Sequence, residues 1–215
     1  MSRIKKFFDE NKYIFIMLGV AAVYAAALRF CFGITPSLVE TFAVAFGIIE
    51  FDLLRREKSS GFAFAVIKCV LLAFWFITIG LYGQVAYRVA FAIFNFVALL
   101  IWLFPKRITN KKNLKPAWLP VKFGLAIYTA AILFGLVMLA CFDAITAMDM
   151  IVAALAALGN LLIIFKKTDT WAIWLAADFI GLPLFFITGS WMYLLLTVFM
   201  MGIEFASLRS WGGKK

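Results

Sequence analysis

The stretch TWAIWLAADFIGLPLFFITG, residues 170–189, is a continuous apolar run long enough to cross a bilayer as a helix. Its middle carries one carboxylate, Asp178, and two tryptophans precede it at Trp171 and Trp174. The spacing i, i+3, i+7 places these three side chains on one face of a helix. A carboxylate at the centre of a bilayer costs about 2.5–3.5 kcal/mol on insertion scales. We therefore expect this face to point at other helices or at a watery cavity.

The composition indicates that this helix is one of many. Of the 215 residues, 66% are hydrophobic and 15% are charged, whereas soluble domains have about 45–50% and about 25%. A soluble domain of this size could not bury so much apolar surface in one core. The apolar runs do not alternate as barrel strands do, so an all-α integral membrane protein is predicted. Transmembrane helices are expected at Tyr13–Gly33, Leu38–Leu54, Gly61–Leu81, Gly83–Phe104, Trp118–Ala140, Ala144–Phe165, Trp171–Gly189 and Trp191–Leu208, about eight in all.

The distribution of basic residues predicts the orientation. The net charge of +10 is concentrated in RIKK, LLRREK, PKRITNKKNLK, FKK and LRSWGGKK, which fall at alternate ends of the expected helices. The opposite connections, GITPS, LYG, CFD and ITGS, carry no Lys or Arg. Such asymmetry orients membrane helices, so both termini and the basic loop Pro105–Lys115 are expected to be cytoplasmic and no nucleic-acid partner is predicted. The N-terminal apolar run lacks a small-residue cleavage site and is interpreted as a retained helix.

An internal repeat is also visible. FAFAVIKCVLLAFWFITIG (Phe62–Gly80) aligns with WAIWLAADFIGLPLFFITG (Trp171–Gly189) at a constant offset, and each segment follows a basic loop. Two three-helix repeats separated by one helix would have the same orientation, as in some transporters. The predicted divisions are an extra N-terminal helix in residues 1–36, a first repeat in 37–104, a cytoplasmic loop and linking helix in 105–140, and a second repeat with a basic tail in 141–215.

The face described above has the chemistry of a binding site. Two indoles supply flat, electron-rich faces that stack on aromatic rings and attract cations. With Asp178 they could receive a planar, hydroxylated solute, cationic or neutral. The alternative is that Trp171 and Trp174 pack as core or as an interfacial belt, with Asp178 tied to Lys68.

The motif W-x-x-W-x-x-x-N/D, here WAIWLAAD, resembles that of the PnuC-type vitamin transporters. The resemblance extends to FDAITAMDMIVAALAALGNLLIIFKKTDTW and to GLYGQVAYRVAFAIFNFVALLIWL, and covers about Leu38 to Trp211. It implies two three-helix bundles joined by a linking helix, as in full-length SWEET proteins, and a homotrimer in the bacterial cytoplasmic (inner) membrane.

The resemblance also implies a function. It implies facilitated uptake of a vitamin, most often nicotinamide riboside for NAD biosynthesis, which phosphorylation traps inside the cell. Relatives carry thiamine, riboflavin or deoxynucleosides, and these alternatives stay open. By the same resemblance, Trp171 and Trp174 would stack on the ring of the substrate and Asp178 would accept a hydrogen bond from it.

Four other polar residues are candidate ligands. Asn160 is either a helix–helix hydrogen-bonding group or a ligand. Asn95 lies deeper along its helix and is a further site candidate. Gln84 and Tyr87 share a helix face and could line an entrance, whereas Arg88 is expected to extend to the membrane interface.

Several charged residues lie within the apolar runs. Some of the acids Glu40, Glu50, Asp149 and Glu204 are expected to face an aqueous path or to pair with Lys68, which is assigned to a buried ion pair. Pro183 is expected to break or kink its helix near the depth of the site.

The sequence argues against an enzyme. It has no histidine, no nucleophile–base set and no phosphate-binding glycine loop, and neither a cofactor nor a metal is expected. Cys31, Cys69 and Cys141 show no disulfide or metal-ligand spacing. A non-transporting scaffold or receptor subunit and a membrane-embedded carboxylate enzyme remain as alternatives.

Overall fold

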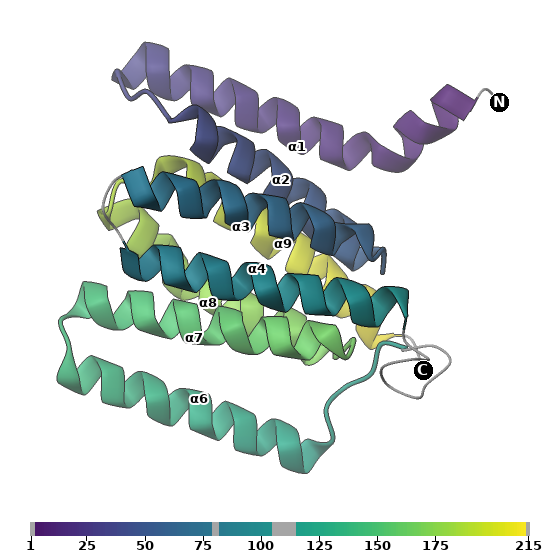
Figure 1. Cartoon of the computed structure of the whole chain (residues 1–215), viewed down its shortest axis with the longest axis vertical. Coiled ribbons are helices and arrows are strands. Elements are labelled where there is room, and N and C mark those ends of the chain that lie inside the picture. The colour runs from purple at the N-terminus through teal and green to yellow at the C-terminus, as the bar shows by residue number, and fades with distance from the viewer. Residues whose placement is uncertain (1–2, 79–81, 105–114, 214–215) are drawn as a thin grey trace.

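The structure, a computed structural model, describes residues 3–78, 82–104 and 115–213. This part of the chain is helical almost throughout, which confirms the predicted all-α class (Figure 1). The helices are α1 (Arg3–Phe32), α2 (Leu38–Arg55), α3 (Ser60–Thr78), α4 (Tyr82–Leu103), α6 (Val121–Cys141), α7 (Ala144–Ile164), α8 (Asp169–Ile187) and α9 (Trp191–Gly212). Five of them, α1 from Asn11 onward and α6 to α9, are long and apolar enough to cross a membrane.

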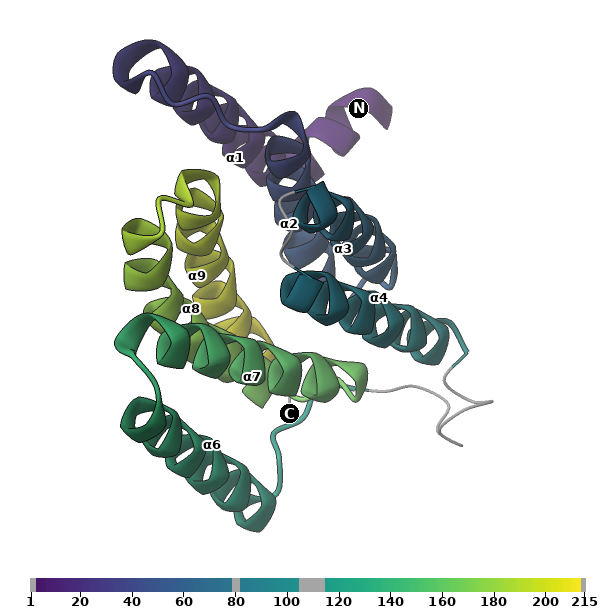
Figure 2. The same ribbon diagram turned by 60° about the vertical axis from the view of Figure 1, so that its left-hand side comes forward.

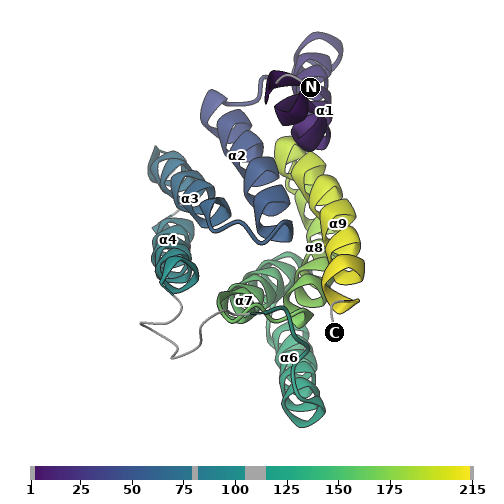
Figure 3. The same ribbon diagram turned by 90° about the vertical axis from the view of Figure 1, so that its right-hand side faces the viewer.

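Six helices form a ring. Helices α2, α3 and α4 pack in sequence, as do α7, α8 and α9, and the contacts α2–α9 and α4–α7 close the circle (Figure 3). The first helix of each set therefore packs against the third helix of the other. Helix α1 lies outside the ring against α2 and α9, and α6 lies outside it against α7 (Figure 2).

The two sets correspond in length and spacing. Helices α3 and α8 both have 19 residues, and α4 and α9 both have 22. Helix α8 begins 109 residues after α3, and α9 begins 109 residues after α4. Glu57 and Lys166 are also 109 residues apart in the sequence. Both of these loop residues have a positive φ, 57° and 51°, and their side chains pair across the ring at 3.1 Å. This correspondence supports the predicted repeat.

Two indoles repeat the same relation. Trp102 near the end of α4 donates from Nε1 to the carbonyl of Ile164 at 3.1 Å. Trp211, 109 residues later in α9, donates from Nε1 to the carbonyl of Arg55 at 2.9 Å. Each set thus hydrogen-bonds, from its third helix, to the last residue of the first helix of the other set.

The basic connections lie together at one end of the bundle. The α2–α3 and α7–α8 connections are at the same end as both termini, and the connections before α2, α7 and α9 are at the opposite end (Figure 1). This agrees with the predicted alternation. Most of the basic loop Pro105–Lys115 lies outside the described residues.

The outer helices have the surface that a bilayer requires. In α6 the only buried residue is Gly124, and large apolar side chains such as Val121 and Leu125 are exposed. Hydrocarbon would bury this surface. Helix α6 begins after Pro120, slightly later than the start predicted at Trp118.

Helix α8 differs from its prediction at Pro183. The helix continues through this proline to Ile187 instead of ending at it. Pro183 is on the exposed side of α8, where the missing hydrogen bond is tolerated because neighbouring backbone groups adjust. Of the break or kink expected at Pro183, the break is wrong.

Candidate substrate site

A cavity of about 110 Å³ lies inside the ring. All six ring helices contribute to its wall. Its lining comprises Glu50 and Phe51 of α2, Lys68 and Cys69 of α3, Tyr87, Arg88, Phe91 and Asn95 of α4, Val152, Ala156 and Asn160 of α7, Trp174, Ala177 and Asp178 of α8, and Met200 of α9.

Of the three residues that define the W-x-x-W-x-x-x-N/D motif, two reach the cavity. Trp174 and Asp178 are one turn apart on α8, and both line the wall. Trp171 does not. It is fully buried, with its ring edge-to-face against Trp174 at 5.4 Å and against Trp211 at 5.3 Å between centroids. The expectation that Trp171 lines the cavity is therefore wrong for this conformation, in which Trp171 packs behind Trp174.

The position of Trp174 depends on Gly159. A Cβ atom at residue 159 would overlap the indole of Trp174, so only glycine allows α7 and this ring to approach so closely. The indole Nε1 donates to the carbonyl of Ala156 at 3.3 Å, and its ring contacts Phe51 edge-to-face at 5.1 Å. The hydroxyl of Thr170 donates to the carbonyl of Gly159 at 3.3 Å. One face of the ring is thus held by α7 and α2.

Of the other predicted ligands, Asn160, Asn95 and Tyr87 line the cavity. The amide of Asn95 donates to the carbonyl of Phe91 at 2.8 Å, and that of Asn160 donates to the carbonyl of Ala156 at 2.9 Å. Both amides bond back to their own helix, which leaves their oxygens as acceptors. The side chain of Gln84 lies outside the described part of the structure.

Two charged residues of the wall pair with each other, and a third lies against aromatic rings. Lys68 Nζ lies 2.5 Å from Glu50 Oε2, so the expected buried ion pair is present and its acid is Glu50 rather than Asp178. Arg88 also lines the cavity, with its guanidinium 5.1 Å from the ring of Tyr87 and 6.0 Å from that of Tyr193. The expectation that Arg88 extends to the membrane interface is wrong.

Sequence reasoning missed Arg88, Phe91 and Met200 as lining residues. One signal could have found more of the site. With the offset of 109 residues, Cys69 corresponds to Asp178, and Asn95 corresponds to Glu204. The two sets of helices therefore place these residues at equivalent positions on their second and third helices.

Toward the basic end, aromatic side chains fill the space enclosed by the six helices. Phe51, Phe62, Trp171, Trp174 and Trp211 belong to one buried cluster, which Trp102 joins.

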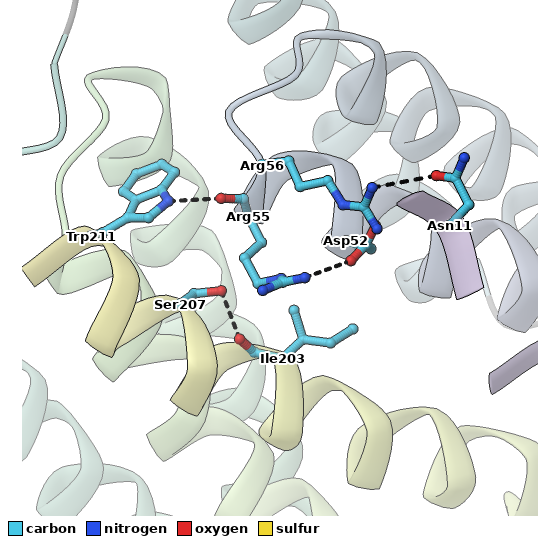
Figure 4. Close-up of polar contacts among 7 residues, drawn as sticks. All are labelled: Asn11, Asp52, Arg55, Arg56, Ile203, Ser207 and Trp211. Carbon is cyan, nitrogen blue, oxygen red and sulfur yellow. Dashed lines mark hydrogen bonds and ion pairs between the residues drawn. The ribbon is translucent and has the colours of Figure 1, made fainter. Parts of the chain in front are cut away.

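Beyond the cluster, polar contacts tie the helix ends together (Figure 4). Asp52 pairs with Arg55 at 3.0 Å and with Arg56 at 2.7 Å, and Arg56 also donates to Asn11 of α1 at 3.4 Å. With the Trp211 bond to Arg55, these contacts join α1, α2 and α9.

The cavity is smaller than the pockets that usually hold metabolites, which have about 300 Å³ or more. A substrate the size of a nucleoside therefore requires the helices to separate. The aromatic cluster and the two reciprocal indole bonds close the basic end, so the structure represents a closed conformation at that end.

A ring of membrane helices around a small cavity of aromatic, amide and charged groups defines a carrier for a small solute, and its class is the membrane transporters. A sequence profile described as "Nicotinamide mononucleotide transporter" matches residues 37–212, and the chain belongs to this family. The fold is similar to that of a solved protein described as "Crystal structure of the Vitamin B3 transporter PnuC". The TM-score is 0.71 at 16% identity, over 99% of this chain and 92% of that chain. A search of curated proteins finds no significant match. The predicted PnuC-type family is thus confirmed.

Proposed function

We propose that this protein carries nicotinamide riboside into the cell by facilitated diffusion, and that phosphorylation inside then traps the substrate. The observation that carries the proposal is that Trp174 and Asp178 face one cavity, one helical turn apart. Membership of the nicotinamide mononucleotide transporter family and the similarity to a vitamin B3 transporter support a vitamin B3 substrate. Thiamine, riboflavin and deoxynucleosides are the alternatives within the same fold.

Each cavity residue has a role in this proposal. The face of the Trp174 indole that lines the cavity stacks on the pyridinium ring, at about 1–2 kcal/mol for a desolvated cation–π contact. Asp178 accepts a hydrogen bond from a ribose hydroxyl and balances the positive charge. Asn95 and Asn160 offer carbonyl oxygens, and Tyr87 and Gln84, in the first two turns of α4, would line an entrance. Trp171 supports Trp174 from behind.

The proposed assembly follows from the same family. It consists of two parallel repeats in residues 37–104 and 141–215, a linking segment in 105–140 that contains α6, and an extra helix within residues 1–36. The equal lengths and the spacing of the helices support the repeats. We propose a homotrimer in the bacterial inner membrane with both termini in the cytoplasm.

Binding to the purified full-length protein tests the substrate. Titration with nicotinamide riboside, thiamine, riboflavin and a deoxynucleoside should give tightest binding for nicotinamide riboside. Trp174→Ala should weaken that binding by roughly tenfold or more. Trp118→Ala removes an exposed tryptophan outside the cavity and should leave it unchanged.

Uptake into liposomes then separates a carrier from a scaffold. A carrier fills the liposomes with labelled substrate, and Trp174→Ala reduces the rate. Absence of specific flux in the parent protein, or unchanged binding in folded Trp174→Ala, would contradict the proposal.

A further inference from the structure

A second carboxyl group lies directly behind Asp178. Glu204 of α9 is fully buried and contacts the carboxyl group of Asp178, but it does not line the cavity. Neither oxygen of Glu204, nor Oδ2 of Asp178, receives a hydrogen bond from any residue that the structure describes. A fully buried acid in contact with a second acid needs an explanation, because buried acceptors without donors are costly.

A single proton shared by the two carboxyl groups would satisfy their buried oxygens. Two carboxylates in contact inside a low-dielectric protein repel each other strongly, and neither can offer the other a donor. If Glu204 keeps its proton, its hydroxyl donates to Asp178, and both acids are then satisfied by one charge-assisted hydrogen bond. Glu204 is the better place for the proton because it has no exposure, whereas Asp178 borders the cavity.

The neighbouring charges leave Asp178 without a counter-ion. Lys68 faces it from α3 but is paired with Glu50 of α2. Arg88 of α4 interacts with Asp149 of α7. The remaining titratable groups around the site are Cys69 of α3, Tyr87 of α4 and Tyr193 of α9, all of which are neutral near pH 7 in their ordinary forms. Among these groups the balance is one negative charge, on Asp178.

We propose that Glu204 is a positioning residue: it stays protonated, and its hydroxyl group donates a hydrogen bond to Asp178. Asp178 therefore stays an oriented carboxylate that selects a substrate with one positive charge. The proposal rests on the proposed function for the choice of substrate. It adds a residue outside the cavity that sets the selectivity for a monocationic ring. A neutral ring of the same shape would leave the charge of Asp178 uncompensated.

Infrared spectroscopy of the ligand-free protein tests the proton directly. The carbonyl stretch of a protonated carboxyl group should be present in the parent at pH 7 and lost in Glu204→Gln. It should persist in Asp178→Asn, since Glu204 keeps its proton, and in Ser207→Ala, which removes a buried hydroxyl bonded to the carbonyl of Ile203 in its own helix. If Glu204→Gln does not remove such a band, the proposal is wrong, whatever the protein transports.

Binding tests the consequence. Nicotinamide riboside and its reduced, uncharged form share a shape and differ in charge. The parent should prefer the cation, and Glu204→Gln should keep that preference within about twofold, because the amide still donates to Asp178. Glu204→Ala should weaken binding of the cation by roughly tenfold, because the hydrogen bond to a buried charge is lost.

The outcomes separate the two proposals. Loss of cation binding in Glu204→Gln, or full binding in Glu204→Ala, overturns the role of Glu204. If the parent binds neither probe, the proposed substrate fails, and the infrared result still decides whether Glu204 carries the proton. A purely structural role would lower both affinities equally and would not be rescued by glutamine.

Discussion

At the scale of single residues, the cavity depends on small side chains as much as on large ones. Trp174 can present a free face only because α7 has no side chain at Gly159. Asn95 and Asn160 each use one amide hydrogen within their own helix, and their carbonyl oxygens remain available as acceptors. A substrate with donors and a positive charge fits these groups better than an anion would.

Gly159→Ala should therefore impair binding without removing any binding group. The added methyl group overlaps the indole, and strain of about 1–3 kcal/mol is typical of overpacked cores. Displacement of Trp174 should weaken substrate binding by roughly ten- to a hundredfold. Calorimetric titration of the folded variant measures this.

Gly202→Ala is the matched control for that substitution. A Cβ at this position of α9 has open space around it, and glycine in a helix interior is less favourable than alanine. Gly202→Ala should bind as the parent does. Unchanged binding in Gly159→Ala would mean that Trp174 does not contact the substrate.

At the scale of elements, helix ends determine how the ring is held. At the basic end, Trp102 and Trp211 make equivalent bonds from the third helix of one set to the first helix of the other. At the opposite end, local hydrogen bonds cap two helices. Ser37 caps α2 by accepting from the backbone of Glu40, and Asp143 caps α7.

Trp211→Phe should loosen the basic end. The variant keeps an aromatic ring in the cluster and loses the hydrogen bond to Arg55, at about 1 kcal/mol. Cys69, which lines the cavity and is buried, then becomes a probe of opening. With Cys31 and Cys141 replaced by serine, Cys69 should react faster with a small thiol reagent in Trp211→Phe than in the parent.

Trp102→Phe provides the symmetric comparison, because it removes the equivalent bond to Ile164. It should raise the reactivity of Cys69 to a similar extent, and substrate should protect Cys69 in both variants. Reactivity unchanged by either substitution would show that the indole bonds do not close the cavity.

Asp143 makes the stability of α7 depend on pH. Hydrogen bonds from the Thr146 side chain and from the backbone of Thr146 and Ile145 hold the pKa of this carboxyl below its usual 3.8. The ionised form is thus favoured in the folded state. Its contribution is present above about pH 4 and is lost as the pH falls through the lowered pKa.

Asp143→Ala should therefore lower the melting temperature at pH 7, since alanine cannot accept from the first turn. The difference from the parent should shrink below about pH 4. Asp143→Asn retains a capping oxygen and should remain close to the parent at pH 7. Thermal unfolding in detergent measures all three proteins, and a difference independent of pH would contradict the role of the charge.

At the scale of the whole molecule, the membrane made most of the fold predictable. Each apolar run had to be a helix, so the class, the family and the approximate helix ends followed from composition, spacing and the motif. Which residues face the cavity could not be predicted in this way. Helices α4 and α8 are apolar on most sides, so periodicity could not show that Arg88 faces the cavity or that Trp171 packs behind Trp174. Both depend on packing between helices distant in sequence.

The orientation of the ring can be tested at its two ends. Lys58 lies in a connection at the basic end and Thr35 in a connection at the opposite end. In a background without native cysteines, Thr35→Cys should react with an impermeant thiol reagent in intact cells. Lys58→Cys should react only after permeabilisation, because basic connections stay in the cytoplasm. The reverse pattern would invert the proposed topology.

The charges of the site also determine whether transport is coupled to an ion. A pump needs a group that gains or loses an ion as the substrate binds. Here Lys68 is neutralised by Glu50, and the proposed proton on Glu204 stays in place while the substrate itself supplies the charge that Asp178 lacks. We therefore expect nicotinamide riboside to equilibrate across the membrane of liposomes with the same final concentration inside and outside. A pH or sodium gradient imposed at zero membrane potential should leave that final ratio unchanged, whereas accumulation driven by either gradient would show that an ion is exchanged in each cycle.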